Sequence, residues 1–160
     1  MTVNTARDPV AVALRLLAVR SHAVGELKVK LKKKGFDETD ISRTVDYLAG
    51  IGSLDDERFA REVLASRTRN KNWGPRKVAA DLAVRGVAQD IIRRVVGSVD
   101  GEAQAALAKE AIARWLRKTG CRMPLGQKEF AKAVRHLTAR GFGLDVVLNG
   151  LRRYDDIDAG

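Results

Sequence analysis

The sequence has little of what secreted, membrane-spanning or disulfide-stabilised proteins require. Its 160 residues include a single cysteine, Cys121, so no disulfide can form within the chain. That usage indicates a reducing compartment, which we take to be the cytoplasm. The longest apolar run near the N-terminus is Val10–Leu14, whereas a membrane span needs about 20 residues and a signal-peptide core about 7. We therefore expect a soluble protein with no membrane partner.

Glycine, proline and aromatic residues are also scarce. The chain has 14 glycines and 3 prolines, so long stretches run without a helix breaker, and apolar residues such as Val10, Leu14 and Leu17 recur at helical spacing. An all-α fold is predicted. Apolar residues make up 45% of the chain, a share too high for a disordered tail. Aromatic residues make up only 5%, which is few for a surface on which bases stack.

A short motif of leucine, a basic residue, glycine and an apolar residue occurs three times. The copies are Leu31–Phe36, Leu82–Val87 and Leu137–Phe142, with offsets of 51 and 55 residues. Glycine accepts the left-handed conformation that ends many helices, so each copy should end a helix. The pattern predicts three tandem three-helix repeats at 1–52, 53–100 and 101–160, the last with an acidic, frayed tail at Asp155–Gly160.

Each repeat should hold a first, a middle and a third helix. The predicted first helices are 8–20, 54–70 and 102–118, the middle helices 23–34, 75–85 and 127–140, and the third helices 38–49, 88–97 and 144–153. A repeat of about 50 residues buries only a thin core alone, so neighbouring repeats should stack into an elongated, curved array. The extra residues of the third repeat should form a loop near Cys121–Leu125.

Several helix ends and core positions follow from local chemistry. Ser21 is predicted to cap the first middle helix, and Asp37 to begin the helix after it. Ser53 and Asp56 look like a capping box, and Pro75 suits the first turn of its helix. Trp115 should be core, whereas Phe36 and Phe142 should pack back on the helices they follow.

Residues for catalysis or metal binding are poorly represented. The two histidines, His22 and His136, fall in different repeats, and Cys121 has no nearby histidine or cysteine. No metal-ligand spacing and no nucleophile motif is present. Asp55 and Asp56 are adjacent on a helix and point about 100° apart, so they suit a helix start better than a shared proton or metal. We expect no enzyme activity, no metal and no cofactor.

Basic residues outnumber acidic ones by 30 to 20, and the net charges of the three predicted repeats are +3, +3 and +4. Within each repeat the cations form a local run. Three such runs along a helical array would suit phosphates, so we predict contacts to nucleic acid or a filament. The predicted contact residues are Lys28, Lys30, Lys32, Lys33, Lys34, Arg67, Arg69, Lys71, Arg76, Lys77, Arg114, Arg117, Lys118, Arg122 and Lys128.

Other interpretations of these runs remain open. Lysine and arginine are good helix formers that stabilise helix C-termini, so each could be solvated surface, and part of the set could meet an acidic protein. Trp73, set among cations, could stack on a base, but a hydrophobic staple ahead of the next helix is the favoured interpretation.

The first two repeats contain a set of motifs in a fixed order: Arg20-Ser21, Glu26-Leu27, Leu31, Lys34-Gly35-Phe36, Leu54-Asp55-Asp56, Arg58-Phe59-Ala60, Gly74-Pro75, Leu82 and Arg85-Gly86-Val87. In this order they resemble the RecX family of regulatory proteins.

The resemblance implies tandem three-helix repeats and a modulator of the RecA recombinase. Such a protein binds the RecA–DNA filament along its groove and restrains its ATPase, strand-exchange and coprotease activities in DNA repair and the SOS response. The expected partners are the RecA filament and single- and double-stranded DNA, bound by a monomer. Two alternatives remain: a free DNA-binding protein with helix-turn-helix-like units, and a protein-binding helical scaffold.

Overall fold

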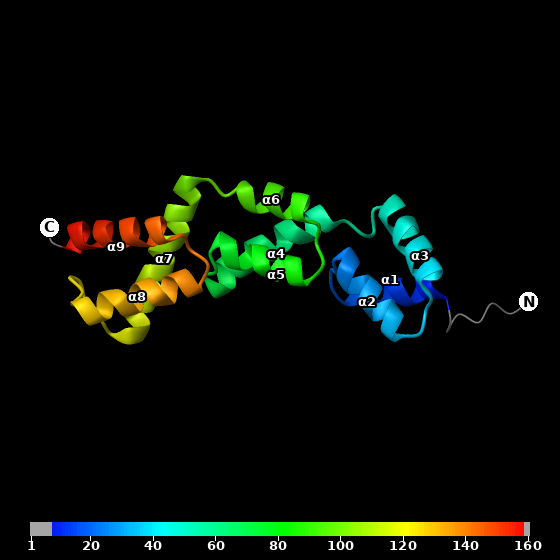
Figure 1. Ribbon diagram of the computed structural model, residues 1–160, viewed down its shortest axis with the longest axis horizontal. Helices are drawn as coiled ribbons and strands as arrows, with labels where there is room; N and C mark the ends of the chain where they lie inside the picture. The colour runs from blue at the N-terminus through cyan, green and yellow to red at the C-terminus, as the bar shows by residue number, and fades with distance from the viewer. Residues whose placement is uncertain (1–7, 159–160) are drawn as a thin grey trace, which may run out of the picture. The chain divides into compact units, whose positions relative to one another are not determined.

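The computed structural model describes residues 8–158, with side chains as far as residue 154, and contains nine α-helices and no strand within that range (Figure 1). The prediction of an all-α fold is confirmed. In chain order the helices are α1 (Pro9–Val19), α2 (Val24–Lys33), α3 (Glu38–Gly50), α4 (Asp56–Lys71), α5 (Pro75–Val84), α6 (Gln89–Gly97), α7 (Gly101–Thr119), α8 (Gln127–Ala139) and α9 (Leu144–Asp158).

All nine predicted helices are present, and only the end of the last differs by more than two residues. Helix α9 continues to Asp158 rather than ending at 153, so the prediction of a frayed acidic tail is wrong for Asp155–Asp158. No glycine or proline stands between Gly150 and Asp158 to end the helix earlier. The last two residues of the predicted tail lie outside the described range.

The predicted cap of the first middle helix is wrong, because α2 begins at Val24 and not directly after Ser21. Ala23, the residue before the helix, is fully buried and has no side-chain acceptor. Two acidic residues replace the missing cap. The Val24 N–H donates to Asp56 Oδ1 at 2.8 Å, and the Ala23 N–H donates to Glu26 Oε2 at 3.3 Å.

The predicted capping box at Ser53 and Asp56 is also wrong. Helix α4 begins at Asp56, and the carboxylate of Asp55 accepts a first-turn N–H at 2.9 Å. Two other predicted starts are confirmed: Asp37 accepts a first-turn N–H of α3 at 2.8 Å, and Pro75 is the first residue of α5.

The recurring motif ends all three middle helices in the same way. Gly35, Gly86 and Gly141 have φ angles of 90°, 80° and 92°, in the region that glycine enters without strain. The following residue donates its N–H to the carbonyl of the motif leucine, at 3.3, 3.1 and 3.3 Å in the pairs Phe36–Leu31, Val87–Leu82 and Phe142–Leu137. This is the Schellman arrangement, in which the apolar residue lies against the helix it follows.

Contacts divide the chain into two compact units. Unit 1 comprises the described residues up to Glu62 together with Leu82–Ile92. Its helices α1, α2 and α3 contact one another, and Figure 1 shows them in blue to cyan. Phe36 packs at the edge of their shared core, as predicted. The buried residues of that core are Ala13, Leu27, Leu31, Ile41, Val45, Leu48 and Leu54.

Unit 2 comprises Val63–Asp81 together with the described residues from Arg93 onward. Helices α7, α8 and α9 contact one another around a core in which Trp115 is 7% and Phe142 2% exposed, as predicted. The extra residues of the predicted third repeat include the loop between α7 and α8. Among the described residues, no helix has the length and apolar character that crossing a membrane requires.

Each unit contains one pair of glycines in backbone contact. In unit 1, a Cβ added to Gly25 would lie 2.7 Å from the Cα of Gly86. In unit 2, a Cβ added to Gly74 would lie 2.5 Å from the carbonyl carbon of Gly141. Each pair joins the start of one middle helix to the glycine that ends the next, so neither side chain position can be filled.

Candidate nucleic-acid interface

The first predicted basic run lies on α2 in unit 1. Lys28 and Lys33 are exposed, as are Lys32 and Lys34, whereas Lys30 is half-buried. Lys32 pairs with Glu38 at 2.7 Å, an exposed ion pair that contributes little to stability. Because the lysines stand near the C-terminus of α2, they also complement the negative end of the helix dipole.

The second run occupies the end of α4, the loop after it and the start of α5, all in unit 2. Arg69, Lys71 and Arg76 are exposed. Arg67 and Lys77 are half-buried, and Arg67 Nε donates to Asp81 Oδ2 at 3.2 Å. Arg67 therefore has a structural partner within its own unit.

Trp73 stands at the centre of this second run. Its ring centroid lies 5.3 Å from the Arg67 guanidinium, 5.4 Å from Lys71 Nζ and 4.8 Å from Lys77 Nζ. These are cation–π distances. A base stacking on the ring would compete with cations already placed over it. Trp73 also stands just before Gly74 at the start of α5, as the predicted hydrophobic staple requires.

The third run is divided between two elements of unit 2. Arg114, Arg117 and Lys118 lie on α7, Arg122 in the loop after it, and Lys128 at the start of α8. All five are exposed.

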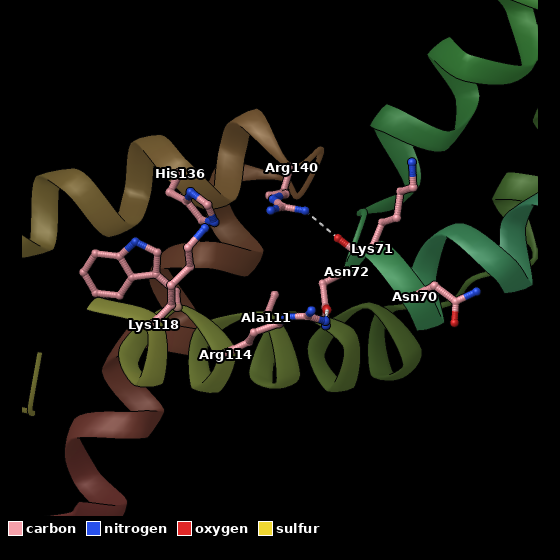
Figure 2. Close-up of a pocket in the computed structure, with 9 residues that line it drawn as sticks. Asn70, Lys71, Asn72, Ala111, Arg114, Lys118, His136 and Arg140 are labelled. Carbon is pink, nitrogen blue, oxygen red and sulfur yellow. Dashed lines mark hydrogen bonds between the residues drawn. The ribbon is translucent and has the colours of Figure 1, made fainter. Parts of the chain in front are cut away.

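Residues of the second and third runs meet at one hollow of about 410 Å³ in unit 2 (Figure 2). The end of α4 contributes Lys71, α7 contributes Arg114 and Lys118, and α8 and its C-cap contribute His136 and Arg140. The rest of the lining consists of Asn70, Asn72, Ala111 and Trp115. The other predicted contact residues do not line this hollow.

Hydrogen bonds within unit 2 fix two of these cations. Arg140 donates to the carbonyl of Lys71 at 2.5 Å, and Arg114 donates to Asn72 Oδ1 at 2.7 Å. The N–H of Gly74 donates to the Arg140 carbonyl at 2.7 Å. The two arginines are thus held against the chain that follows α4, and Figure 2 shows both bonds as dashed lines.

No acidic residue lines the hollow. Burial lowers the pKa of His136, and the charges of Arg140, Lys118 and Lys77 lower it further. His136 is therefore neutral at neutral pH, and the net charge of the hollow comes from lysine and arginine. Such a site attracts anions and can hold a phosphate through several charge-assisted hydrogen bonds.

Two titratable residues of the hollow, His136 and Arg140, are absent from the predicted contacts. The sequence pattern assigns no contact to His136, and it marks Arg140 only as the basic residue of the recurring motif. One signal was present in the sequence: the residue before the motif glycine is basic in all three copies, as Lys34, Arg85 and Arg140. Arg85 donates to Glu26 of α2 at 3.0 Å, and Arg140 donates to the carbonyl of Lys71, the last residue of α4, at 2.5 Å.

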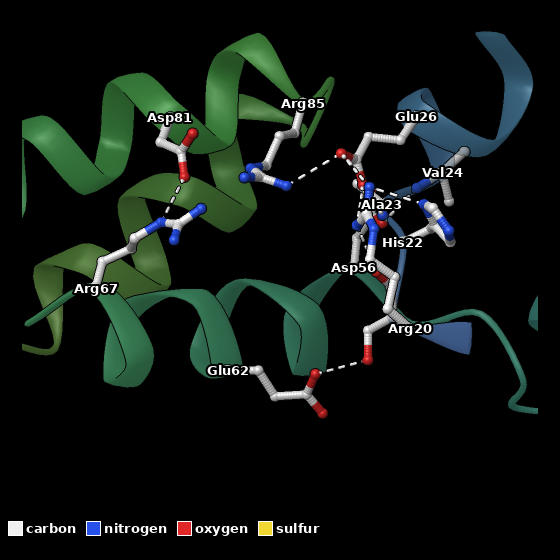
Figure 3. A network of polar contacts seen from close by, with 11 residues as sticks. Arg20, His22, Ala23, Val24, Glu26, Asp56, Glu62, Arg67, Asp81 and Arg85 are labelled. Carbon is white, nitrogen blue, oxygen red and sulfur yellow. Dashed lines mark hydrogen bonds and ion pairs between the residues drawn. The ribbon is translucent and has the colours of Figure 1, made fainter. Parts of the chain in front are cut away.

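The corresponding network in unit 1 contains acids (Figure 3). Glu26 accepts hydrogen bonds from Arg20 at 3.3 Å and from Arg85 at 3.0 Å. The buried His22 lies 3.5 Å from the same carboxylate. Asp56 caps α2, as described above. Here arginine charge is compensated within the protein, unlike in the hollow of unit 2.

Burial raises the pKa of Glu26, but hydrogen bonds from Arg20 and the Ala23 N–H, with the charges of Arg20 and Arg85, bring it below its ordinary value overall. Burial lowers the pKa of His22, and the charge of Arg20 adds to that effect. The carboxylate is thus ionised and the imidazole neutral at neutral pH. Among the described residues, no group of three histidine, cysteine or acidic side chains could hold a metal ion.

Family models match two parts of the chain. Residues 11–48 match the first three-helix domain of RecX, and residues 55–96 match its second three-helix domain. The chain is also similar to two crystal structures of RecX. The protein from Lactobacillus salivarius superposes with a TM-score of 0.80 at 17% identity, over 92% of this chain and 94% of that one. Another RecX structure gives a TM-score of 0.75 at 21% identity, over 86% of this chain and 67% of that one.

Curated relatives extend the similarity from fold to sequence. The regulatory protein RecX of Pelodictyon phaeoclathratiforme is 41% identical over 110 residues, 69% of each chain. That of Mycobacterium tuberculosis is 37% identical over 108 residues, which are 68% of this chain and 62% of that protein. On the strength of both the family models and these identities, the chain belongs to the RecX family of regulatory proteins.

Proposed function

We propose that this chain is a non-enzymatic regulator that binds the RecA–DNA filament and restrains the recombinase, ATPase and coprotease activities of RecA in DNA repair and the SOS response. Membership of a family of regulatory proteins supports the regulatory part of the proposal. The observation that carries the nucleic-acid part is the basic hollow of unit 2, which has four lysine and arginine side chains and no acidic one in its lining.

The proposed mechanism needs no chemical step by this chain. Cations from the three basic runs contact the phosphates of filament DNA or acidic groups of the filament wall. Several weak contacts along one chain raise avidity without a strong single contact. Binding changes RecA activity only if the chain has different affinities for different filament states. The chain acts as a monomer in the cytoplasm in this proposal.

The test measures ATP hydrolysis by RecA on saturating single-stranded DNA while this chain is added. The proposal predicts a dose-dependent fall in rate, and no phosphate release by the chain alone. An unchanged rate at saturating chain would contradict it. Salt-dependent binding to bare DNA as tight as binding to the filament would favour the free DNA-binding alternative. Salt-independent filament binding without DNA affinity would favour the protein scaffold.

A charge-neutralising variant links the effect to the second run. We expect Arg69→Gln, Lys71→Gln and Arg76→Gln, combined, to require several-fold more protein for half-maximal inhibition and to flatten the salt dependence of binding. All three side chains are exposed, so the fold should persist. The matched control replaces three other exposed cations of unit 2, Lys109, Lys132 and Arg135, by glutamine. Equal effects of the two triple variants would show that only total charge matters.

A further inference from the structure

We propose that the hollow between the end of α4, α7 and the end of α8 is a binding site for a single phosphate group of the nucleic-acid backbone. This inference rests on the proposed function and deepens it, because it assigns the DNA contact to one place in unit 2. The rest of the basic surface then contributes long-range attraction, whereas the hollow holds a phosphate at a defined position.

The donors come from two elements that are far apart in the sequence. Arg114 and Lys118 come from α7 and Arg140 from the C-cap of α8, whereas the Lys71 side chain points away from them, with its Nζ 5.4 Å from the Trp73 ring centroid (Figure 2). A guanidinium has five N–H donors, and the hydrogen bonds of Arg140 to Lys71 and of Arg114 to Asn72 use one nitrogen of each arginine. Those bonds orient the two arginines, and their remaining donors are available to a bound anion. Fixed donors lose less entropy on binding than lysines on an open helix face.

Among the described residues, none of the cations that line the hollow forms a salt bridge with an acid. Arg67, outside the lining, pairs with Asp81, and Arg85 in unit 1 pairs with Glu26. The lining of the hollow offers no such carboxylate. A phosphate entering it would gain charge-assisted hydrogen bonds without displacing a protein acid.

The lining favours a backbone phosphate over a free nucleotide. Trp115 is only 7% exposed, so it presents little ring surface to a base. The ring of Trp73 carries Arg67, Lys71 and Lys77 over it instead of an open face. Because the hollow has no surface on which a base could stack, it would recognise only the phosphate of a nucleotide. Contacts to phosphate carry no sequence information.

The pKa of His136 can report whether a phosphate is bound in the hollow. The charged groups around it are Arg140 at the end of its own helix, Lys118 and Arg114 from α7, Lys71 from α4 and Lys77 from α5. Burial lowers the pKa of His136, and the charges of Arg140, Lys118 and Lys77 lower it further. A phosphate in the hollow adds a negative charge and raises that pKa again. By linkage, phosphate affinity should rise as pH falls from 8 towards 6.

The experiment follows the two histidine ring signals of the full chain by NMR while the oligonucleotide dT12, inorganic phosphate or ATP is added. We expect dT12 to shift the His136 signal and raise its pKa, and to leave His22 of unit 1 unchanged. Inorganic phosphate should shift the same signal at higher concentration. No shift of His136 by dT12 would overturn the proposal. Tighter binding of ATP than of dT12 would overturn its assignment to the nucleic-acid backbone.

Two lysines on α7 provide a matched pair of variants. Lys118 lines the hollow, whereas Lys109 lies nine residues earlier, about 180° around the helix. We expect Lys118→Gln to weaken dT12 binding about 3- to 10-fold and to lower the salt slope by about 0.7. Lys109→Gln should change both by much less. Equal effects would overturn the site, and His136→Gln should remove most of the pH dependence.

The outcomes separate this inference from the proposed function, since the NMR experiment contains no RecA. If dT12 shifts His136 but RecA hydrolysis is unaffected, the phosphate site stands and the regulatory proposal fails. If hydrolysis falls while His136 does not respond to dT12, the regulatory proposal stands and the phosphate site fails.

Discussion

The two compact units use the same backbone contact but surround it with different charge. In unit 1, Gly25 meets Gly86, and the carboxylate of Glu26 pairs with Arg85 beside them. In unit 2, Gly74 meets Gly141, and the nearby Arg140 donates to a backbone carbonyl instead of an acid. The fold therefore repeats while its electrostatics do not. The arginine charge of unit 1 is compensated within the protein, whereas the lining of the hollow in unit 2 contains no acidic residue.

The largest expected effect comes from filling a glycine contact. In Gly141→Ala, the new Cβ would lie 2.4 Å from the Lys77 nitrogen and also require a left-handed φ of 92°. We expect a loss of about 2–5 kcal/mol in the free energy of unfolding, measured by urea denaturation. Gly35→Ala is the control, since its φ is 90° but no atom lies within 4 Å. It should lose only about 1–2 kcal/mol, and an equal loss would refute the role of the close contact.

The second-largest effect is expected from replacing Glu26, the acid of unit 1 that pairs with Arg85. We expect Glu26→Gln to lower the free energy of unfolding by about 1–3 kcal/mol, because Arg20 and the partly buried Arg85 each lose an ion pair with Glu26. The lowered pKa of Glu26 adds stability above its unfolded value of about 4.5, and this part is lost as pH falls through the lower folded pKa. The variant should therefore lose less stability than the wild type below pH 5. An identical acid profile would contradict this role.

A smaller effect should follow from Asp56→Ala, which removes the acceptor of the Val24 N–H. Loss of a helix cap costs about 1 kcal/mol, measurable by thermal unfolding. At the start of α5 in unit 2, the Gly74 N–H donates to the Arg140 carbonyl, a bond made by backbone alone. Arg140→Ala should therefore leave that bond in place. If Asp56→Ala is neutral, the start of α2 does not depend on α4.

The smallest effect is expected for an exposed cation of the first run. Lys28→Gln should change the free energy of unfolding by less than about 0.5 kcal/mol, since its side chain is exposed. It should also weaken dT12 binding less than Lys118→Gln does. A larger loss of binding than for Lys118→Gln would place the main anion contact in unit 1.

Much of the fold could be predicted because its signals are local. Apolar spacing gave all nine helices, and the motif glycines at 35, 86 and 141 located three helix ends. The start of α2 could not be predicted, because its cap, Asp56, stands 32 residues away from Val24. Nothing in the residues around Ser21 shows that an acid from another helix will take its place.

The candidate site was only partly predictable for the same reason. The runs containing Lys71, Arg114 and Lys118 were visible as charge, but their meeting in one hollow depends on how α4, α7 and α8 pack. The net charges of the three predicted repeats are nearly equal. These totals do not show which charges are paired: Glu26 compensates Arg85, whereas no acid among the residues lining the hollow compensates Arg140.

The most direct test of this difference is the salt dependence of dT12 binding for two double variants of the full chain. One replaces Arg114 and Lys118, which line the hollow, by glutamine; the other replaces the exposed Lys28 and Lys33 of unit 1. The account predicts that the slope of log affinity against log salt falls by about 1.4 for the first pair and by clearly less for the second. Equal losses, or a greater loss for the second pair, would contradict it.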